Sequence, residues 1–246
     1  MRIFGDGIII KRLRTAKLSS KSNKSKLIFK KSKVRMANGT SPLQVLMEDF
    51  HDWRLKEFPE YATTADVHLY NDRLETISLE KFDERKAKCD EFLSRLRSID
   101  EKELSSLDLL NYELLDEHLN MCIEGYQWRF HGACNPVTFL ENTHINFKSF
   151  LIDATPLNNK EDLLNYAKRI KSIPSEISEQ INVMREAIVH KTTLHRLSVE
   201  RVPEQLTEII ESAIEQNPFF EPCLNKIAVL KGIYWNIDES SIKVDL

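Results

Sequence analysis

Apolar residues recur at steps of three and four along most of the chain after residue 40, which is the period of an α-helix. The first stripe consists of Leu43, Leu46, Met47, Phe50 and Trp53. Ser41 can accept a hydrogen bond from an early backbone N–H, Pro42 suits the first helical position, and Gln44 can complete a capping box. Because Pro59 disfavours a helical conformation in the residue before it, this helix is predicted to end near Glu57.

The same pattern predicts two further long helices. One starts at Ser78, and its stripe is Leu79, Phe82, Cys89, Phe92, Leu93, Leu96 and Ile99. The stems of Arg85 and Lys86 are expected to cover apolar surface in the gap of that stripe. The other follows Ser105 and runs to about Gln127, with an inward stripe of Leu107, Leu110, Leu114, His118, Cys122 and Tyr126. Short links between amphipathic helices favour antiparallel neighbours.

The pattern is interrupted between the third helix and residue 157. Residues 129–156 are rich in Asn, His and Phe and have no long period, so one short helix is expected within a longer connection. A helical pattern then resumes. Asn158 and Glu161 can cap a helix that is predicted to run through Ile170.

Two more helices are predicted towards the C-terminus. Ser172-Ile173-Pro174 is interpreted as the start of one, with an inward stripe of Ile177, Ile181, Met184 and Ile188. The last covers residues 203–216 and ends before Pro218, with Leu206, Ile209, Ile210, Ala213 and Ile214 inward. The fold is therefore predicted to be an all-α bundle of about six helices.

Composition supports this interpretation. The 246 residues are 41% hydrophobic and 30% charged, as in a soluble globular protein, and they include only six glycines. No apolar run approaches the ~20 residues that span a bilayer. The four cysteines, Cys89, Cys122, Cys134 and Cys223, occur singly, so we expect reduced thiols rather than disulfides or a zinc site.

Charge divides the chain unevenly. Residues 1–35 contain 12 Lys and Arg residues and one acid, which gives +11, whereas the remainder has 23 bases and 37 acids, which gives −14. The acidic body argues against a nucleic-acid partner. The basic leader has three interpretations: a mitochondrial presequence, a tail that binds nucleic acid or an anionic membrane, or disordered sequence upstream of a start at Met36. The predicted location is cytoplasmic, with mitochondrial as the alternative.

No catalytic, cofactor-binding or metal-binding residue is predicted. None of the seven histidines is followed by Glu, and His190 and His195 would lie ~140° apart around a helix. Glycine-rich phosphate loops and nucleophile-elbow motifs are absent from the sequence. One polar cluster, His68, Tyr70, Asp72 and Arg73, has two interpretations. It could face a cleft, or it could tie the first helix to the bundle through a buried Asp–Arg contact.

Two stretches carry a resemblance to a known family. The first combines Phe50-x-x-Trp53, Phe58-Pro59-Glu60-Tyr61-Ala62-Thr63 and His68-x-Tyr70-x-Asp72-Arg73-Leu74, and the second is MREAIVHKTTLHRLSVERVPEQL at residues 184–206. In this order they resemble the domain of unknown function 885 family, over roughly Leu43 to Cys223. One position departs, because Ala187 stands where the family commonly has Gly after Arg-Glu.

The resemblance implies an α-helical, zinc-metallopeptidase-like fold of the gluzincin type, with its His-Glu zinc helix in a second half. This chain would correspond to the N-terminal half, divided into a leader (1–35), a helical domain (36–223) and a divergent tail (224–246). Zinc is expected only in full-length members. The leading hypothesis is a truncated member without peptidase activity of its own. The alternative is a non-enzymatic helical interaction module or short regulatory form, which binds protein through an exposed apolar face.

Overall fold

The computed structural model describes residues 41–131, 137–140, 145, 150–151, 154–221 and 224. Within these residues the chain forms helices and no strand, which confirms the all-α prediction. The α-helices are α2 (Pro42–Glu57), α3 (Pro59–Thr64), α4 (Leu79–Arg97), α5 (Ser106–Gly125), α7 (Lys160–Val189), α8 (Arg196–Val199) and α9 (Val202–Glu211). Short 3-10 helices are η1 (His68–Tyr70), η2 (Glu101–Glu103), η3 (Tyr126–Trp128) and η4 (Ile214–Gln216).

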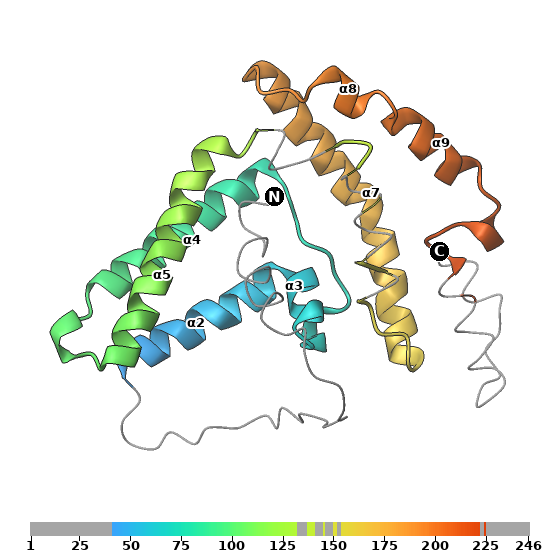
Figure 1. Ribbon diagram of the computed structural model, residues 1–246. Helices are drawn as coiled ribbons and strands as arrows, with labels where there is room; N and C mark the ends of the chain where they lie inside the picture. Colours follow the sequence, from blue (N-terminus) through green and yellow to red (C-terminus); the bar gives the residue numbers. More distant parts are fainter. Residues whose placement is uncertain are drawn as a thin grey trace, which may run out of the picture.

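The helices form two groups (Figure 1). Helices α2, α4 and α5 pack together, and α4 and α5 are antiparallel neighbours joined through η2. The long helix α7 stands on the other side of α3, and α8 and α9 return along its outer side. The connection between α3 and α4 runs between the two groups, so its contacts decide how they are joined. No helix among the described residues is long and apolar enough to cross a membrane.

Local capping sets the ends of the first three long helices as predicted. The Gln44 backbone N–H donates to Ser41 Oγ at 3.2 Å, and the Ser41 N–H donates to Gln44 Oε1 at 3.3 Å. Ser78 Oγ and Ser105 Oγ cap α4 and α5 by accepting from the backbone N–H groups of Lys81 and Asp108, each at 3.2 Å. Helix α2 ends at Glu57, as the following proline requires.

The first core cluster lies between α2, α4 and α5. Its buried members are Leu43, Leu46, Cys89, Phe92, Leu93, Leu96, Tyr112, Leu115, Leu119 and Cys122. The predicted stripes of α2 and α4 contain all of the buried members from those two helices. Phe50 and Trp53 pack against Phe92 with ring centroids 5.3 and 5.6 Å away, so an aromatic group closes the cluster.

The predicted inward face of α5 is wrong apart from its C-terminal part. Leu107, Leu110 and Leu114 are 68, 50 and 56% exposed, whereas the buried residues are Tyr112, Leu115, Leu119 and Cys122. Apolar residues occur on both sides of this helix, so two stripes satisfy the same 3.6-residue period. Packing against α4 selects one of them and leaves the other on the surface.

Helix α7 is one continuous helix, so the predicted boundary at Pro174 is wrong. Its cap is also one residue later than predicted, because Asn159 Oδ1 accepts from the Asp162 N–H at 3.0 Å. An internal proline removes a backbone donor at a cost of about 3 kcal/mol. Buried residues lie on both sides of it: Leu163, Tyr166 and Arg169 before, and Glu176, Gln180 and Val183 after. This anchoring on both sides offsets the cost.

The predicted inward stripes of the last two helices point outward. Ile177, Ile181, Met184 and Ile188 of α7 are 44, 42, 39 and 65% exposed. Helix α9 ends at Glu211 rather than at residue 216, and Leu206, Ile210, Ala213 and Ile214 are exposed, with Ile209 half-buried. A smaller second cluster of Leu74, Leu151, Leu163 and Tyr166 holds α7 instead. The short helix expected within 129–156 falls largely outside the described residues.

The face of α5 can be tested with two leucines on one helix. Leu119 is fully buried and Leu114 is 56% exposed. Leu119→Ala should lower the free energy of unfolding by about 2–5 kcal/mol, because it leaves a cavity in the core. Leu114→Ala should change it by no more than about 0.5 kcal/mol. Urea denaturation followed by circular dichroism measures both, and equal losses would contradict this packing.

Candidate functional site

The predicted polar cluster lies in the connection between α3 and α4, but its expected buried Asp–Arg contact is wrong. Arg73 Nε donates to Asp72 Oδ1 at 3.0 Å, yet the two side chains are 51 and 34% exposed. The pair joins neighbours in sequence and therefore ties nothing distant together. The interactions that hold this segment come from two other arginines, Arg169 and Arg85.

Arg169 of α7 is fully buried and binds the connection through neutral oxygen atoms. Its guanidinium donates to Thr63 Oγ1 (2.7 Å), the carbonyl O of Arg73 (3.0 Å), Thr155 Oγ1 (3.2 Å) and the carbonyl O of Tyr70 (3.3 Å). It also lies over the Phe150 ring, 4.9 Å from the centroid. Burial lowers the pKa of Arg169 to about 10, so the group remains cationic at neutral pH.

Arg85 of α4 is 1% exposed and joins α2 to the end of the same connection. Its Nε donates to Glu57 Oε1 at 2.8 Å and its Nη1 to Glu75 Oε1 at 3.0 Å. Its Nη2 donates to the Thr76 carbonyl at 2.7 Å, and its guanidinium lies 4.8 Å from the Phe58 ring centroid. The stem of Arg85 was expected to cover apolar surface, and the structure shows that its guanidinium is buried as well. In the sequence, the sign that Arg85 is buried is its position inside the apolar stripe of α4.

A chain of hydrogen bonds extends from Arg169 to the surface. Thr63 Oγ1 accepts from Arg169 and lies 2.8 Å from Asn71 Oδ1, to which it donates. Asn71 Nδ2 then donates to His68 Nδ1 at 3.2 Å, so His68 Nε2–H donates to Asp66 Oδ1 at 3.0 Å. The hydroxyl and the imidazole are both occupied by these contacts. This arrangement fixes the loop and does not activate a nucleophile.

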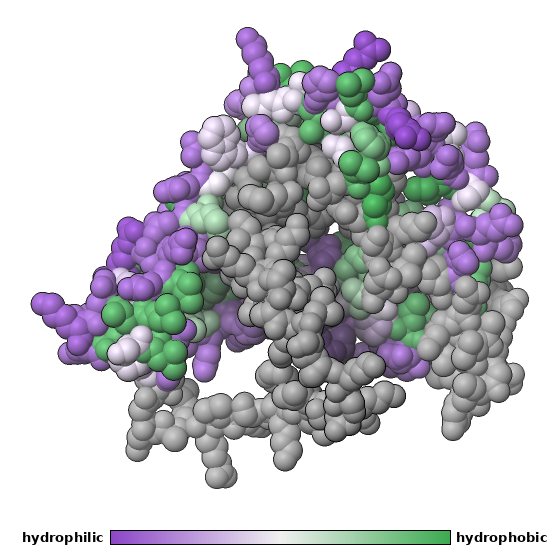
Figure 2. All heavy atoms as spheres, viewed as in Figure 1, coloured by the Kyte–Doolittle hydropathy of each residue, from purple (hydrophilic) through white to green (hydrophobic). Residues whose placement is uncertain are grey.

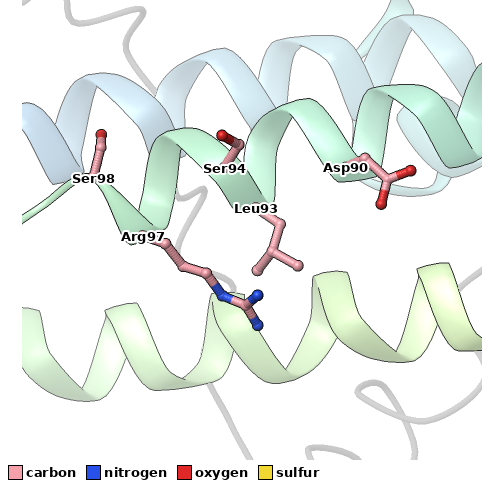
Figure 3. A pocket seen from close by; sticks show the side chains of 5 residues that line it. All are labelled: Asp90, Leu93, Ser94, Arg97 and Ser98. Atoms are coloured by element: carbon pink, nitrogen blue, oxygen red, sulfur yellow. The ribbon is translucent and has the colours of Figure 1, made fainter.

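A shallow groove of about 490 Å³ lies along α4, lined by Asp90, Leu93, Ser94, Arg97 and Ser98 (Figure 3). Arg97 extends from α4 across α5, where its Nε donates to Asp116 Oδ1 at 3.3 Å and its Nη2 to Asn120 Oδ1 at 3.1 Å. Its guanidinium is therefore engaged in helix pairing. Neither lining serine has a histidine beside it, so the lining residues contain no nucleophile–base pair.

A second, much smaller cavity lies inside the α2–α4–α5 group. Its lining residues are Phe50, Trp53, Arg54, Phe58, Cys89, His118 and Cys122. Cys122 Sγ is 3.8 Å from His118 Nε2. The helical period places His118 and Cys122 on one stripe of α5 but gives no connection with Cys89 of α4. Cys89 and Cys122 are free thiols, as predicted, whereas Cys134 and Cys223 lie outside the described residues.

The described residues do not fit the zinc that the resemblance implies for the family. No group of three or more His, Cys, Asp or Glu side chains within them could hold a metal ion. His190 stacks on Phe130 with ring centroids 4.8 Å apart and lies 3.9 Å from Glu186, while His195 caps α8. The absence of a metal site from the whole chain stays a prediction, because His144 lies outside the described residues.

The fold and this polar centre define an all-α protein in which buried arginines organise the loop between two helical groups. The chain belongs to the family described as bacterial protein of unknown function (DUF885), whose model matches residues 59–238. The match confirms the family resemblance and includes both quoted stretches from Pro59 onward. It also includes residues 224–238, within the predicted tail. Comparison with curated proteins and with solved structures finds no match.

Replacing Arg169 tests the loop clamp. Arg169→Met should lower the free energy of unfolding by about 3 kcal/mol or more, because hydrogen bonds to a charged group are worth about 1.5–3 kcal/mol each. Arg169→Lys should recover little of this, since an ammonium cannot reproduce the planar fork. Arg185→Met, on an exposed turn of the same helix, is the matched control. A loss in chemical denaturation no larger than the control's would contradict the clamp.

Arg85 offers a second comparison within one helix. Arg85→Met should cost about 3–5 kcal/mol, because it leaves the Glu75 carboxylate buried without its charged partner. Arg95→Met removes a 40% exposed arginine that pairs with Asp49, and an exposed pair is worth about 0–1 kcal/mol. Thermal and urea unfolding of the two variants should therefore differ strongly. Similar losses would mean that the buried pair contributes no more than a surface pair.

Proposed function

We propose that this chain is a non-catalytic helical unit of a metallopeptidase-like fold, and that it acts by docking against a further helical unit. Family membership supports the first part, together with a sequence in which no histidine is followed by Glu. Zinc peptidases of this kind need two His on one helical face and an adjacent Glu as general base. The chain would form one wall of a cleft whose zinc site lies elsewhere.

The observation that carries this proposal is the apolar surface on the second helical group. Exposed apolar side chains form a stripe on α7 (Ile177, Ile181, Met184 and Ile188), and further exposed apolar side chains follow at Leu197, Leu206, Ile210 and Ile214. Figure 2 shows apolar side chains gathered where α7 and α8 meet. An exposed apolar stripe of this kind is typical of a surface that another protein element covers. The stripe has helical spacing, so a helix is a suitable partner.

An alternative is a separate interaction module that docks on a different protein through the same surface. Both versions need the apolar stripe, and they differ in the size of the native protein. Immunodetection in native cells with an antibody against residues 43–74 separates them. A species near 28.7 kDa favours the interaction module, and a substantially larger species favours a unit of a longer hydrolase.

The absence of activity has a direct test on the full 246-residue chain. The purified protein should contain no stoichiometric zinc by atomic spectroscopy and should not cleave a mixed peptide library. The physical reason is that no group of three or more His, Cys, Asp or Glu side chains within the described residues could hold a metal ion and generate a hydroxide nucleophile. Stoichiometric zinc together with chelator-sensitive cleavage would overturn the proposal.

The docking surface has its own test. The full chain should bind an environment-sensitive dye and self-associate in sedimentation experiments, because its apolar stripe is uncovered. Ile181→Lys with Ile188→Lys should reduce both signals several-fold, since each places a charge in the stripe. Ser175→Lys is an exposed control on the same helix. A monomeric, dye-silent wild-type protein would count against a docking role.

A further inference from the structure

Two buried cysteines from different helices share one cavity with a histidine. Cys89 of α4 and Cys122 of α5 are 1 and 4% exposed, and both line the cavity inside the first helical group. The cavity measures about 10 Å³, which is close to the space that one water molecule requires. It therefore excludes bulky thiol reagents but admits a molecule of nearly water size.

His118 is placed to act on one of these thiols. Its Nε2 lies 3.8 Å from Cys122 Sγ, one helical turn away, and its ring packs edge-on against Phe50. Its Nδ1 is buried and has no hydrogen-bond partner. Core packing explains the position of the ring. It does not explain the buried Nδ1, because a buried nitrogen without a hydrogen-bond partner lowers the stability of the folded protein.

We propose that Cys89 and Cys122 form a reversible disulfide between α4 and α5 when hydrogen peroxide oxidises the protein, with His118 as the base that serves Cys122. Peroxide is the oxidant class that suits this site, because it is among the smallest oxidants that react with thiolates. The disulfide would join two helices that already pack along their length. Forming it draws the sulfur atoms to about 2.05 Å.

The two cysteines have different roles in this reaction. The interaction with Cys89 and then with His118 lowers the pKa of Cys122 to about 5, against the opposing effect of burial. The interaction with Cys122 and burial both raise the pKa of Cys89. Because His118 Nε2 lies 3.8 Å from Cys122 Sγ and can take its proton, Cys122 is the attacking thiolate and Cys89 is the resolving thiol.

The chemistry balances in two steps. Cys122 transfers its proton to His118 and attacks one peroxide oxygen, so an S–O bond forms as the O–O bond breaks, and the departing hydroxide takes the proton as water. Cys89 sulfur then attacks Cys122 sulfur, so the S–S bond forms as the S–O bond breaks, and the second water leaves with the Cys89 proton. Two thiols lose two electrons, and peroxide is reduced to two water molecules.

The test is peptide mapping of the full chain after limited peroxide treatment. The protein is unfolded in an alkylating reagent, digested without reductant and analysed by mass spectrometry. We expect a cross-linked peptide pair that contains Cys89 and Cys122, and its loss when dithiothreitol precedes alkylation. This measurement uses the wild-type chain, so it does not depend on whether a variant folds.

Three variants assign the roles. After peroxide treatment and unfolding in dimedone, Cys89→Ser should show a sulfenic acid adduct at Cys122, whereas Cys122→Ser should show no such adduct at Cys89. His118→Gln should slow formation of the cross-link at least about tenfold, as expected for loss of a positioned base. Recovery of both cysteines as thiols at peroxide levels that oxidise a free thiol standard would overturn the proposal. Pairing of either cysteine with Cys134 or Cys223 would overturn it as well.

Discussion

A buried guanidinium is the constraint on which the arrangement of this protein depends. Arg169 of α7 donates to neutral oxygen atoms of the connection that precedes α4, so the charge is held by hydrogen bonds and ring contact. Removing a cation from water is costly, and that cost is offset only when its donors are satisfied together. The loop between α3 and α4 must therefore keep the conformation that presents these oxygen atoms.

Arg85 complements this clamp from the opposite side of the same connection. It binds Glu57 at the end of α2 and Glu75 shortly before α4. The two arginines thus hold one loop between the α2–α4–α5 group and α7. Within residues 58–74, Thr63 Oγ1 and the carbonyl oxygens of Tyr70 and Arg73 accept hydrogen bonds from Arg169. These oxygen atoms satisfy a buried cation, which gives this stretch a structural role.

The second helical group has the opposite character. Helices α7, α8 and α9 place much of their apolar surface outward, and the small cluster around Leu74 and Tyr166 covers only part of α7. A proline is tolerated within α7 because buried residues anchor the helix before and after it. The combination of a rigid long helix and an uncovered apolar stripe is the physical basis for a docking role. The buried thiols of Cys89 and Cys122 lie in the first helical group and are not part of that surface.

The sequence by itself determined where the early helices begin and end, because capping and proline effects involve only neighbouring residues. The side chains of Ser41, Ser78 and Ser105 each accept a hydrogen bond from a backbone N–H three residues later. Both stretches that resemble the family are likewise recognised from the order of neighbouring residues. Only the tertiary structure decided which of two apolar faces of α5 is buried and whether α7 continues through Pro174. It also decided that Arg85 and Arg169 are buried and that Cys89 meets Cys122. Each of these depends on a partner that is distant in sequence, and helical periodicity carries no information about that partner.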